Sequence, residues 1–531
     1  MTVARKEYRP LGRWDAISCL ALAVLTVVLF LYFLRPPILS DQLDYFYHAW
    51  QTDGLQPTHR HLRIGLVFPV HLAIKMFGYS ELSYYVVPSF GALSLALATW
   101  FVARILFGTW TGIFASALMV SNPQVLTSFS DLLPDYLSAG LYTWSLGILI
   151  WCWRTGRLAT RPDEWPTFFL LALSGFFIGW SYLAREYVVF FFPSVIFVLL
   201  LASAQTASFV AVALGAAFCW LLELTWGLIK HGDPLARLHA VVSPRAVSQF
   251  VEMDVVDVLF QLPHLVLNRS GGLLFACLLV FGIGASAWCS LSGDRRWQLL
   301  ALWLIGGWLF FTVVALMPVI LLGEEHVYLR MHKFRYWALI LPPGVIAGVA
   351  GSQQLIGFLA RRVDPGGAHC AGASAIGIAA AVVFLGATIA VVSASKYSGL
   401  VRNGMDDYLE FRRFMKNVED ADELVLLQGG PLLESSGRSL PIYLNAWNGS
   451  DEVWRGRVVN ASTRDLDDII TKPGRKLVAI DLSRTQWLRS TGRGRSPEAV
   501  LQRLEDAGER IFDSSGERVV VYKVEGKQEG D

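Results

Sequence analysis

Two carboxylates, Asp41 and Asp44, follow shortly after the first apolar segment of the chain. They lie in the stretch Asp-Gln-Leu-Asp-Tyr-Phe-Tyr-His, which begins at Asp41 and is rich in aromatic residues. If a helix begins here, the three-residue spacing points both carboxylates roughly the same way. A partly desolvated carboxylate can take the proton of a hydroxyl nucleophile, so the pair is a candidate for general-base catalysis. Each aspartate alone is more often a helix N-cap or a solvated loop residue.

Three further acidic residues lie in or beside apolar segments. Asp135 follows Pro134 just before such a segment, where an aspartate is a candidate for chemistry and also a good helix cap. Glu223 lies inside an apolar segment, where an ionisable residue is costly and is therefore a functional candidate. Glu186 stands next to Arg185 in a predicted tight turn, and we expect these two neighbours to form a structural ion pair.

The elements that must position these residues are long apolar helices. The chain has 531 residues, of which 54% are hydrophobic and 17% charged, and its mean hydropathy is +0.45. Because a helix needs about 20 apolar residues to cross a bilayer, recurring runs of this kind indicate a polytopic α-helical membrane protein. We predict eleven spans, at residues 15–34, 84–106, 111–122, 133–153, 166–184, 187–203, 207–229, 272–291, 298–322, 336–359 and 371–394.

The charge pattern predicts the orientation of these spans. The first span is too long for a signal-peptide core and follows a basic segment, so we predict a retained helix with a cytoplasmic N-terminus. Even-numbered spans then end in the cytoplasm, in agreement with the positive-inside rule. The loops predicted there carry Arg154, Arg157 and Arg161, then Arg295 and Arg296, then Arg361 and Arg362. We therefore predict a multi-pass protein of the inner (plasma) membrane, with residues 395–531 outside the cytoplasm.

Several basic residues on the predicted outer side oppose this charge bias. They are Arg60 and Arg63, then Lys230, Arg237 and Arg245, then Arg330, Lys333 and Arg335. These charges disfavour the predicted orientation in the membrane, and binding of an anionic ligand such as a phosphate would offset that effect. A guanidinium group binds phosphate through two parallel hydrogen bonds. Ordinary solvated loop charge is the simpler interpretation. The sequence shows no strong metal-binding motif, so we predict no metal ligands.

The segment 395–531 differs from the membrane domain predicted at residues 1–394. Strands are predicted at 423–427, 476–480 and 518–524, and helices from Asp406 and from Ser496. Strands that alternate with helices indicate a small extracytoplasmic α/β domain. This domain has no cysteine and the net charge of the whole chain is only +2, so we expect neither structural disulfides nor a nucleic-acid partner.

Several short motifs, in this order, resemble those of the membrane-embedded GT-C glycosyltransferases. They are Asp41-x-x-x-Tyr45-x-x-x-Ala49, the run from Pro69 to Glu81, Leu133-Pro134-Asp135, and Phe334-Arg335-Tyr336 before Leu341-Pro342-Pro343. The chain is similar to the branch that contains protein O-mannosyltransferases, the lipid A aminoarabinose transferase and bacterial homologues that transfer sugars to lipopolysaccharide. It departs from the usual Asp-Glu pair, because Gln42 follows Asp41. The C-terminal domain carries no recognisable acceptor-binding signature.

This resemblance implies an integral-membrane glycosyltransferase. Its donor would be a sugar linked to polyprenyl phosphate, and its acceptor a hydroxyl of an envelope glycan, lipid or protein on the outer face of the bilayer. Asp41 would be the catalytic base, supported by Asp135 and Asp44, and the transfer would invert the anomeric centre. No cofactor is required, although a divalent cation is compatible with the scheme. We predict that the donor and its phosphate are bound by Arg335, Lys333, Arg330, Tyr45, Tyr336 and Arg63.

Three other functions remain open at this level. A polymerase or ligase of surface polysaccharide would also be a transferase, but it would use a pyrophosphate-linked donor. A transporter or lipid flippase would favour inverted repeats and broken helices, which the sequence does not show. A non-catalytic assembly protein would leave the clustering of Asp41, Asp135 and the outer cations unexplained.

Overall fold

We analysed a computed structural model of the chain. It describes residues 12–35, 41–50, 62–78, 80–126, 128–160, 164–241, 251–253, 256, 260, 273–310, 312–313, 327–329, 337–363, 405–418, 423–427, 458–461, 465–482, 495–517 and 519–526. The chain divides into two compact units. The first unit comprises Met1–Phe33, Gly54–Pro69 and Val86–Val401, and the second comprises Leu34–Asp53, Val70–Tyr85 and Arg402–Asp531. The domain boundary predicted at residue 394 lies outside the described residues.

The first unit is built from apolar helices, and the described residues of the first ten predicted spans overlap them. These helices are α1 (Arg13–Tyr32), α4 (Glu81–Phe107), α5 (Thr109–Ser121), α7 (Pro134–Arg154), α9 (Trp165–Ala184), the 3-10 helix η1 (Glu186–Phe191) with α10 (Phe192–Leu201), α11 (Thr206–His231), α15 (Leu273–Leu291), α16 (Arg295–Ala301) with the π-helical turn η2 (Leu302–Gly306), and α18 (Leu341–Val363). The eleventh predicted span, 371–394, lies outside the described residues. Among the described residues, α1, α4, α9 and α11 are long and apolar enough to cross a membrane.

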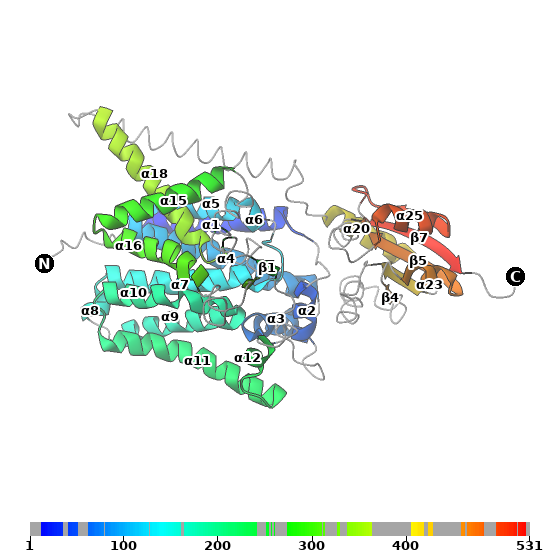
Figure 1. Ribbon diagram of the computed structural model, residues 1–531, viewed down its shortest axis with the longest axis horizontal. Helices are drawn as coiled ribbons and strands as arrows, with labels where there is room; N and C mark the ends of the chain where they lie inside the picture. The colour runs from blue at the N-terminus through cyan, green and yellow to red at the C-terminus, as the bar shows by residue number, and fades with distance from the viewer. Residues whose placement is uncertain are drawn as a thin grey trace. The chain divides into compact units, whose positions relative to one another are not determined.

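Helix α9 lies between α7 and α11 (Figure 1). Small residues make both contacts possible. A Cβ atom added to Gly175 would lie 1.9 Å from the carbonyl oxygen of Val212, so the α9 and α11 backbones touch at this glycine. On the other side, Ser138 of α7 exchanges hydrogen bonds with Ser181 of α9, and their two hydroxyl oxygens lie 2.9 Å apart. These contacts fix the C-terminal end of α9, where Arg185 and Glu186 follow.

Two short helices precede α4. They are α2 (Asp41–Trp50) and α3 (Ile64–Phe77). A Cβ atom added to Gly65 would lie 2.3 Å from the backbone nitrogen of Ala184, so the start of α3 rests directly on the end of α9. The indole of Trp180 also donates to the carbonyl oxygen of Gly65 at 3.0 Å. The residue just before α3, Arg63, is thereby held beside the α9–η1 turn.

A pair of very short strands joins two segments that are distant in sequence. β1 (Val251–Met253) runs antiparallel to β2 (Val327–Leu329), with Glu252 opposite Tyr328. Sequence analysis missed this ribbon because strands of three residues are too short to show the alternation that identifies a strand. The pairing places Val251–Met253, which follow α11 in the sequence, next to Val327–Leu329.

The second unit contains a five-stranded mixed sheet with helices on both faces (Figure 1). The strand order is β4 (Val458–Ala461), β3 (Glu423–Leu427), β5 (Gly474–Asp481), β7 (Val519–Gly526) and β6 (Gly508–Asp513). β3 pairs in parallel with β4 and β5, whereas β7 is antiparallel to both of its neighbours. The sequence analysis predicted three of these strands at nearly the observed positions, β3, β5 and β7.

Alternate residues of the central strands bury against helices on opposite faces of this sheet. Leu424 and Leu426 pack with Phe411 of α20 (Met405–Asn417). Val425 and Leu427 face the other side, where α23 (Leu466–Thr471) and α25 (Pro497–Glu505) pack. Helix α25 begins as its sequence predicts: the Ser496 hydroxyl accepts a hydrogen bond from the backbone nitrogen of Ala499 at 3.1 Å, and Pro497 is the first helical residue.

Candidate functional site

Helix α2 begins at Asp41, as expected if the chain restarts as a helix there. Asp41 and Asp44 are therefore three residues apart on one helix, in its first turns. The structure describes the backbone of these two residues but not their side chains. Tyr45, the adjacent candidate, is a buried aromatic residue that is 1% exposed.

Polar and aromatic contacts tie α2 to α3 and to the start of α4. The hydroxyl of Tyr84 donates to the side-chain oxygen of Gln42 at 2.5 Å, and the ring of Tyr84 packs edge-on against Phe46. On the other side, Nδ1 of His71 donates to the carbonyl oxygen of Ala49 at 2.6 Å. Gln42 is 4% exposed, so a neutral amide occupies the buried position next to Asp41. This scaffold sets the direction of the helix that carries Asp41.

Asp135 lies in the first turn of α7 and forms a buried ion pair with Arg185. Its Oδ1 accepts a hydrogen bond from Arg185 Nε at 3.0 Å and another from the Tyr187 hydroxyl at 3.1 Å. Asp135 is 1% exposed and Arg185 6%. The N-cap position of α7 is Leu133, which makes no side-chain cap bond. Asp135 therefore has two partners in the α9–η1 turn and is not the N-cap of its own helix.

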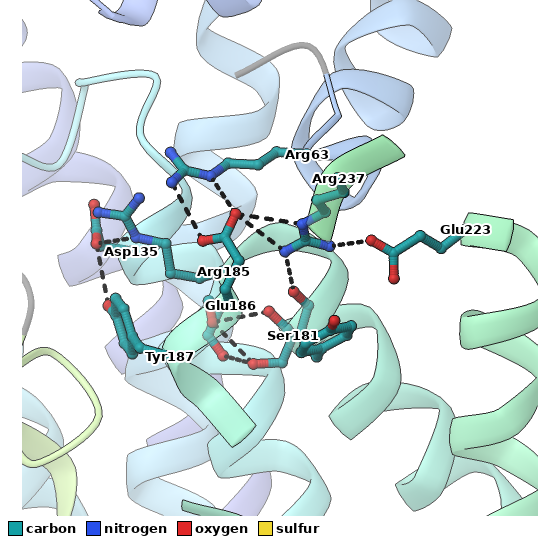
Figure 2. Close-up of polar contacts among 10 residues, drawn as sticks. Arg63, Asp135, Ser181, Arg185, Glu186, Tyr187, Glu223 and Arg237 are labelled. Atoms are coloured by element: carbon teal, nitrogen blue, oxygen red, sulfur yellow. Dashed lines mark hydrogen bonds and ion pairs between the residues drawn. The ribbon is translucent and has the colours of Figure 1, made fainter. Parts of the chain in front are cut away.

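Glu186, the next residue, lies between two other arginines (Figure 2). Its two oxygens accept hydrogen bonds from Arg63, with Nε to Oε1 at 3.0 Å and Nη2 to Oε2 at 3.2 Å. Nε and Nη2 of Arg237, from α12 (Ala236–Val241), lie 3.3 Å from Oε1 of the same carboxylate. Our expectation that Arg185 and Glu186 pair with each other was wrong, because these neighbours direct their side chains to partners on different segments.

Arg237 connects Glu186 to Glu223 inside α11. Its Nη1 donates to Glu223 Oε1 at 2.9 Å, and its Nη2 donates to the carbonyl oxygen of Tyr182 at 2.7 Å. The guanidinium carbon also lies 4.9 Å from the centre of the Tyr182 ring, at cation–π distance. Glu223, the carboxylate that the sequence places inside an apolar segment, is thus the last member of a charge series. The charge series consists of Arg63, Glu186, Arg237 and Glu223, whose charges alternate in sign.

The neighbouring arginine side chains keep Glu186 ionised. Burial by itself would raise the pKa of its carboxyl group, but the guanidinium groups of Arg63, Arg237 and Arg185 outweigh that effect and hold the pKa well below its usual range. Glu186 is therefore an anion throughout the physiological pH range. The consecutive residues Arg185 and Glu186 join two sequence-predicted candidates, because Asp135 binds the first and Arg63 binds the second.

The other candidates cannot be placed. Arg330, Lys333, Arg335 and Tyr336 lie outside the described residues, so their assignment as donor-binding residues stays a prediction. Sequence reasoning did not combine Arg63, Arg185, Glu186, Glu223 and Arg237 into one cluster. The available signal was that each of these ionisable residues stands in or next to an apolar segment, where a lone charge would be costly.

No protein-family model matches the sequence, and no curated protein matches it. Solved structures nevertheless share its fold. ArnT from Cupriavidus metallidurans in the apo state is 15% identical with a TM-score of 0.52, over 97% of this chain and 100% of that one. The same protein bound to undecaprenyl phosphate is 14% identical with a TM-score of 0.50, over the same shares. The archaeal oligosaccharyltransferase AglB from Archaeoglobus fulgidus is 12% identical with a TM-score of 0.49, over 96% of this chain and 74% of that one.

The chain thus shares the GT-C fold of ArnT, as the sequence motifs suggested. The similarity to ArnT extends over 97% of this chain, which agrees with the resemblance found in the sequence motifs. At 15% identity the likeness establishes the fold.

Proposed function

We propose that this chain is an integral-membrane glycosyltransferase that moves a sugar from a polyprenyl-phosphate donor to an acceptor hydroxyl on the outer face of the membrane. The observation that carries this proposal is the GT-C fold over 97% of the chain, in which α2, beginning at Asp41, follows α1 in the sequence. One of the similar structures is that of ArnT bound to undecaprenyl phosphate. Because nucleotide sugars are made in the cytoplasm, a transferase that faces outward needs a donor of this lipid-linked kind.

In the proposed mechanism, Asp41 takes the proton of the acceptor hydroxyl. The acceptor oxygen then forms a bond to the anomeric carbon while the bond from that carbon to the donor phosphate oxygen breaks, with inversion. Polyprenyl phosphate leaves with the electron pair as an anion and needs no strong acid. Basic side chains stabilise its charge, for which we propose Arg63, Lys333 and Arg335. No step requires a metal ion.

Asp135 has a positioning role in this scheme. It anchors Arg185 and Tyr187, and through the neighbouring Glu186 it fixes the turn against which Arg63 lies. Asp44 is proposed to support Asp41 from the same helix.

The proposed side of the reaction can be tested through the topology. Eleven spans and a cytoplasmic N-terminus place residues 395–531 outside the cytoplasm. We expect a reporter that is active only after export to be active when fused after Asp531 and inactive when fused after Arg362. The reverse pattern would refute the span count and would place the proposed site on the wrong side of the membrane.

A deletion strain of the source organism tests the activity itself. Loss of the transferase should leave its donor unused, so we expect a polyprenyl-phosphate sugar to accumulate in membrane extracts and one sugar to disappear from an envelope glycan, lipid or protein. Mass spectrometry of the two fractions measures both changes. Accumulation of a pyrophosphate-linked oligosaccharide instead would favour a polymerase or ligase. An unchanged set of lipid-linked sugars would leave only a transport or assembly role.

A further inference from the structure

Glu186 occupies the edge of Arg63 that a phosphate group would use. We propose that Glu186 competes with the phosphate of a polyprenyl phosphate for Arg63, so that binding of this lipid exchanges one anion for another and leaves Glu186 on Arg237. This inference rests on the proposed function, because it takes the ligand to be a polyprenyl phosphate.

The geometry of the Arg63–Glu186 contact is the first support. Both carboxylate oxygens are engaged, one by Nε and the other by Nη2 of the same guanidinium group. This paired arrangement is the one in which arginine also binds two oxygens of a phosphate. A phosphate and the Glu186 carboxylate therefore cannot use this edge of Arg63 at the same time.

Arg237 gives Glu186 a second partner. Arg237 is fixed independently of Glu186, since it donates to Glu223 at 2.9 Å and to the Tyr182 carbonyl oxygen at 2.7 Å. It also reaches Glu186 Oε1 at 3.3 Å. If Glu186 gave up Arg63, its charge would still be paired, which avoids the large penalty of an isolated buried carboxylate.

Exposure and charge identify Glu186 as the one of these four residues that a phosphate could replace. Its side chain is 26% exposed, against 10% for Arg63, 5% for Arg237 and 10% for Glu223. Asp135 neutralises Arg185, and Glu223 contacts only the far side of Arg237 in Figure 2. The Glu186 carboxylate thus lies between the positive charges of Arg63 and Arg237 and pairs with both. Another anion bound to Arg63 could neutralise that guanidinium group in its place.

A purely structural role for Glu186 predicts the opposite effect on binding. If the carboxylate served only to hold Arg63 in place, its removal would release the guanidinium and weaken binding of a phosphate. If the carboxylate competes with the phosphate, its removal should tighten binding. The two roles are therefore separated by the direction of the change in affinity.

The test uses the purified full-length protein in lipid nanodiscs. The apparent Kd is measured by thermophoresis for undecaprenyl phosphate and for undecaprenol, its uncharged alcohol. For Glu186→Gln we expect the Kd of undecaprenyl phosphate to fall roughly tenfold, the equivalent of one charge-assisted hydrogen bond, while the Kd of undecaprenol stays unchanged. Glu186→Asp keeps the charge but is one methylene shorter, so its Kd should lie between those of Glu186→Gln and the wild type.

The matched control is Glu223→Gln. This substitution removes one negative charge from the same cluster of charged residues, but the Glu223 carboxylate binds Arg237 and not Arg63. The variant therefore measures the general electrostatic effect of losing one negative charge. Glu186→Gln should tighten binding clearly more than this control does. If Glu186→Gln does not fold, Glu186→Asp decides alone, and tighter binding than wild type supports competition.

Two negative outcomes can be told apart. If the wild type prefers undecaprenyl phosphate over undecaprenol but neither Glu186 variant binds it more tightly, the competition is refuted and the proposed function stands. If the wild type binds the two lipids equally, the donor class is wrong and the competition falls with it.

Discussion

Replacing Asp41 by asparagine is expected to lower sugar transfer at least about a hundredfold, which is the usual scale for loss of a general base. The substitution keeps the size of the side chain and removes only its ability to take a proton. Because α2 is held by contacts of Gln42, Phe46 and Ala49, the protein level and the melting temperature should stay near those of the wild type. The measurement is the initial rate of transfer in membranes of the deletion strain, at matched protein levels.

Asp44→Asn is the control for this prediction. It makes the same chemical change one helical turn further along α2, so any general effect of charge on the helix is shared by both variants. We expect it to reduce transfer less than Asp41→Asn does. If Asp41→Asn transfers sugar at the wild-type rate, Asp41 is not the general base. If Asp44→Asn loses more activity than Asp41→Asn, Asp44 is the general base instead.

The sequence predicted the helices well where a single physical rule determines them. Predicted span 207–229 corresponds to α11 at Thr206–His231, because a stretch long enough to cross a bilayer stands out from its composition alone. The sheet strands at 423–427 and 476–480 were found for a related reason: they are short, apolar and bounded by polar residues. Helix α12 and the β1–β2 ribbon are too short to carry such a signal.

The candidate site was only partly predictable, because its contacts join residues that are far apart in the chain. Arg63 and Glu186 are 123 residues apart, and Arg237 lies 51 residues beyond Glu186. Spacing rules relate residues within one helix or strand, so they identified Asp41 and Asp44 but could not pair Arg63 with Glu186. They also suggested the wrong partner for Arg185, since the adjacent residue was the only one that local reasoning could offer. The burial of Asp135 against Arg185 needed the packing of α7 on α9.

Replacing Arg237 by methionine should destabilise the protein more than any other single change in this cluster. Arg237 is 5% exposed, and its guanidinium contacts Glu186, Glu223 and the carbonyl oxygen of Tyr182. Methionine keeps much of the apolar volume but leaves Glu223 as an uncompensated carboxylate within α11. Breaking one partner of a buried ion pair typically costs about 3–5 kcal/mol, so we expect a marked fall in the melting temperature in detergent.

Two further variants show whether the lost charge is the cause. Adding Glu223→Gln to Arg237→Met removes the uncompensated carboxylate, so the double variant should regain most of the lost stability. Arg237→Lys should be intermediate, because an ammonium group on a flexible stem cannot satisfy two carboxylates and a carbonyl in one plane as a guanidinium does. If Arg237→Met melts like the wild type, the ion pairs of Arg237 contribute little to stability. If the double variant stays as unstable as Arg237→Met, the loss comes from packing against Tyr182 and not from charge.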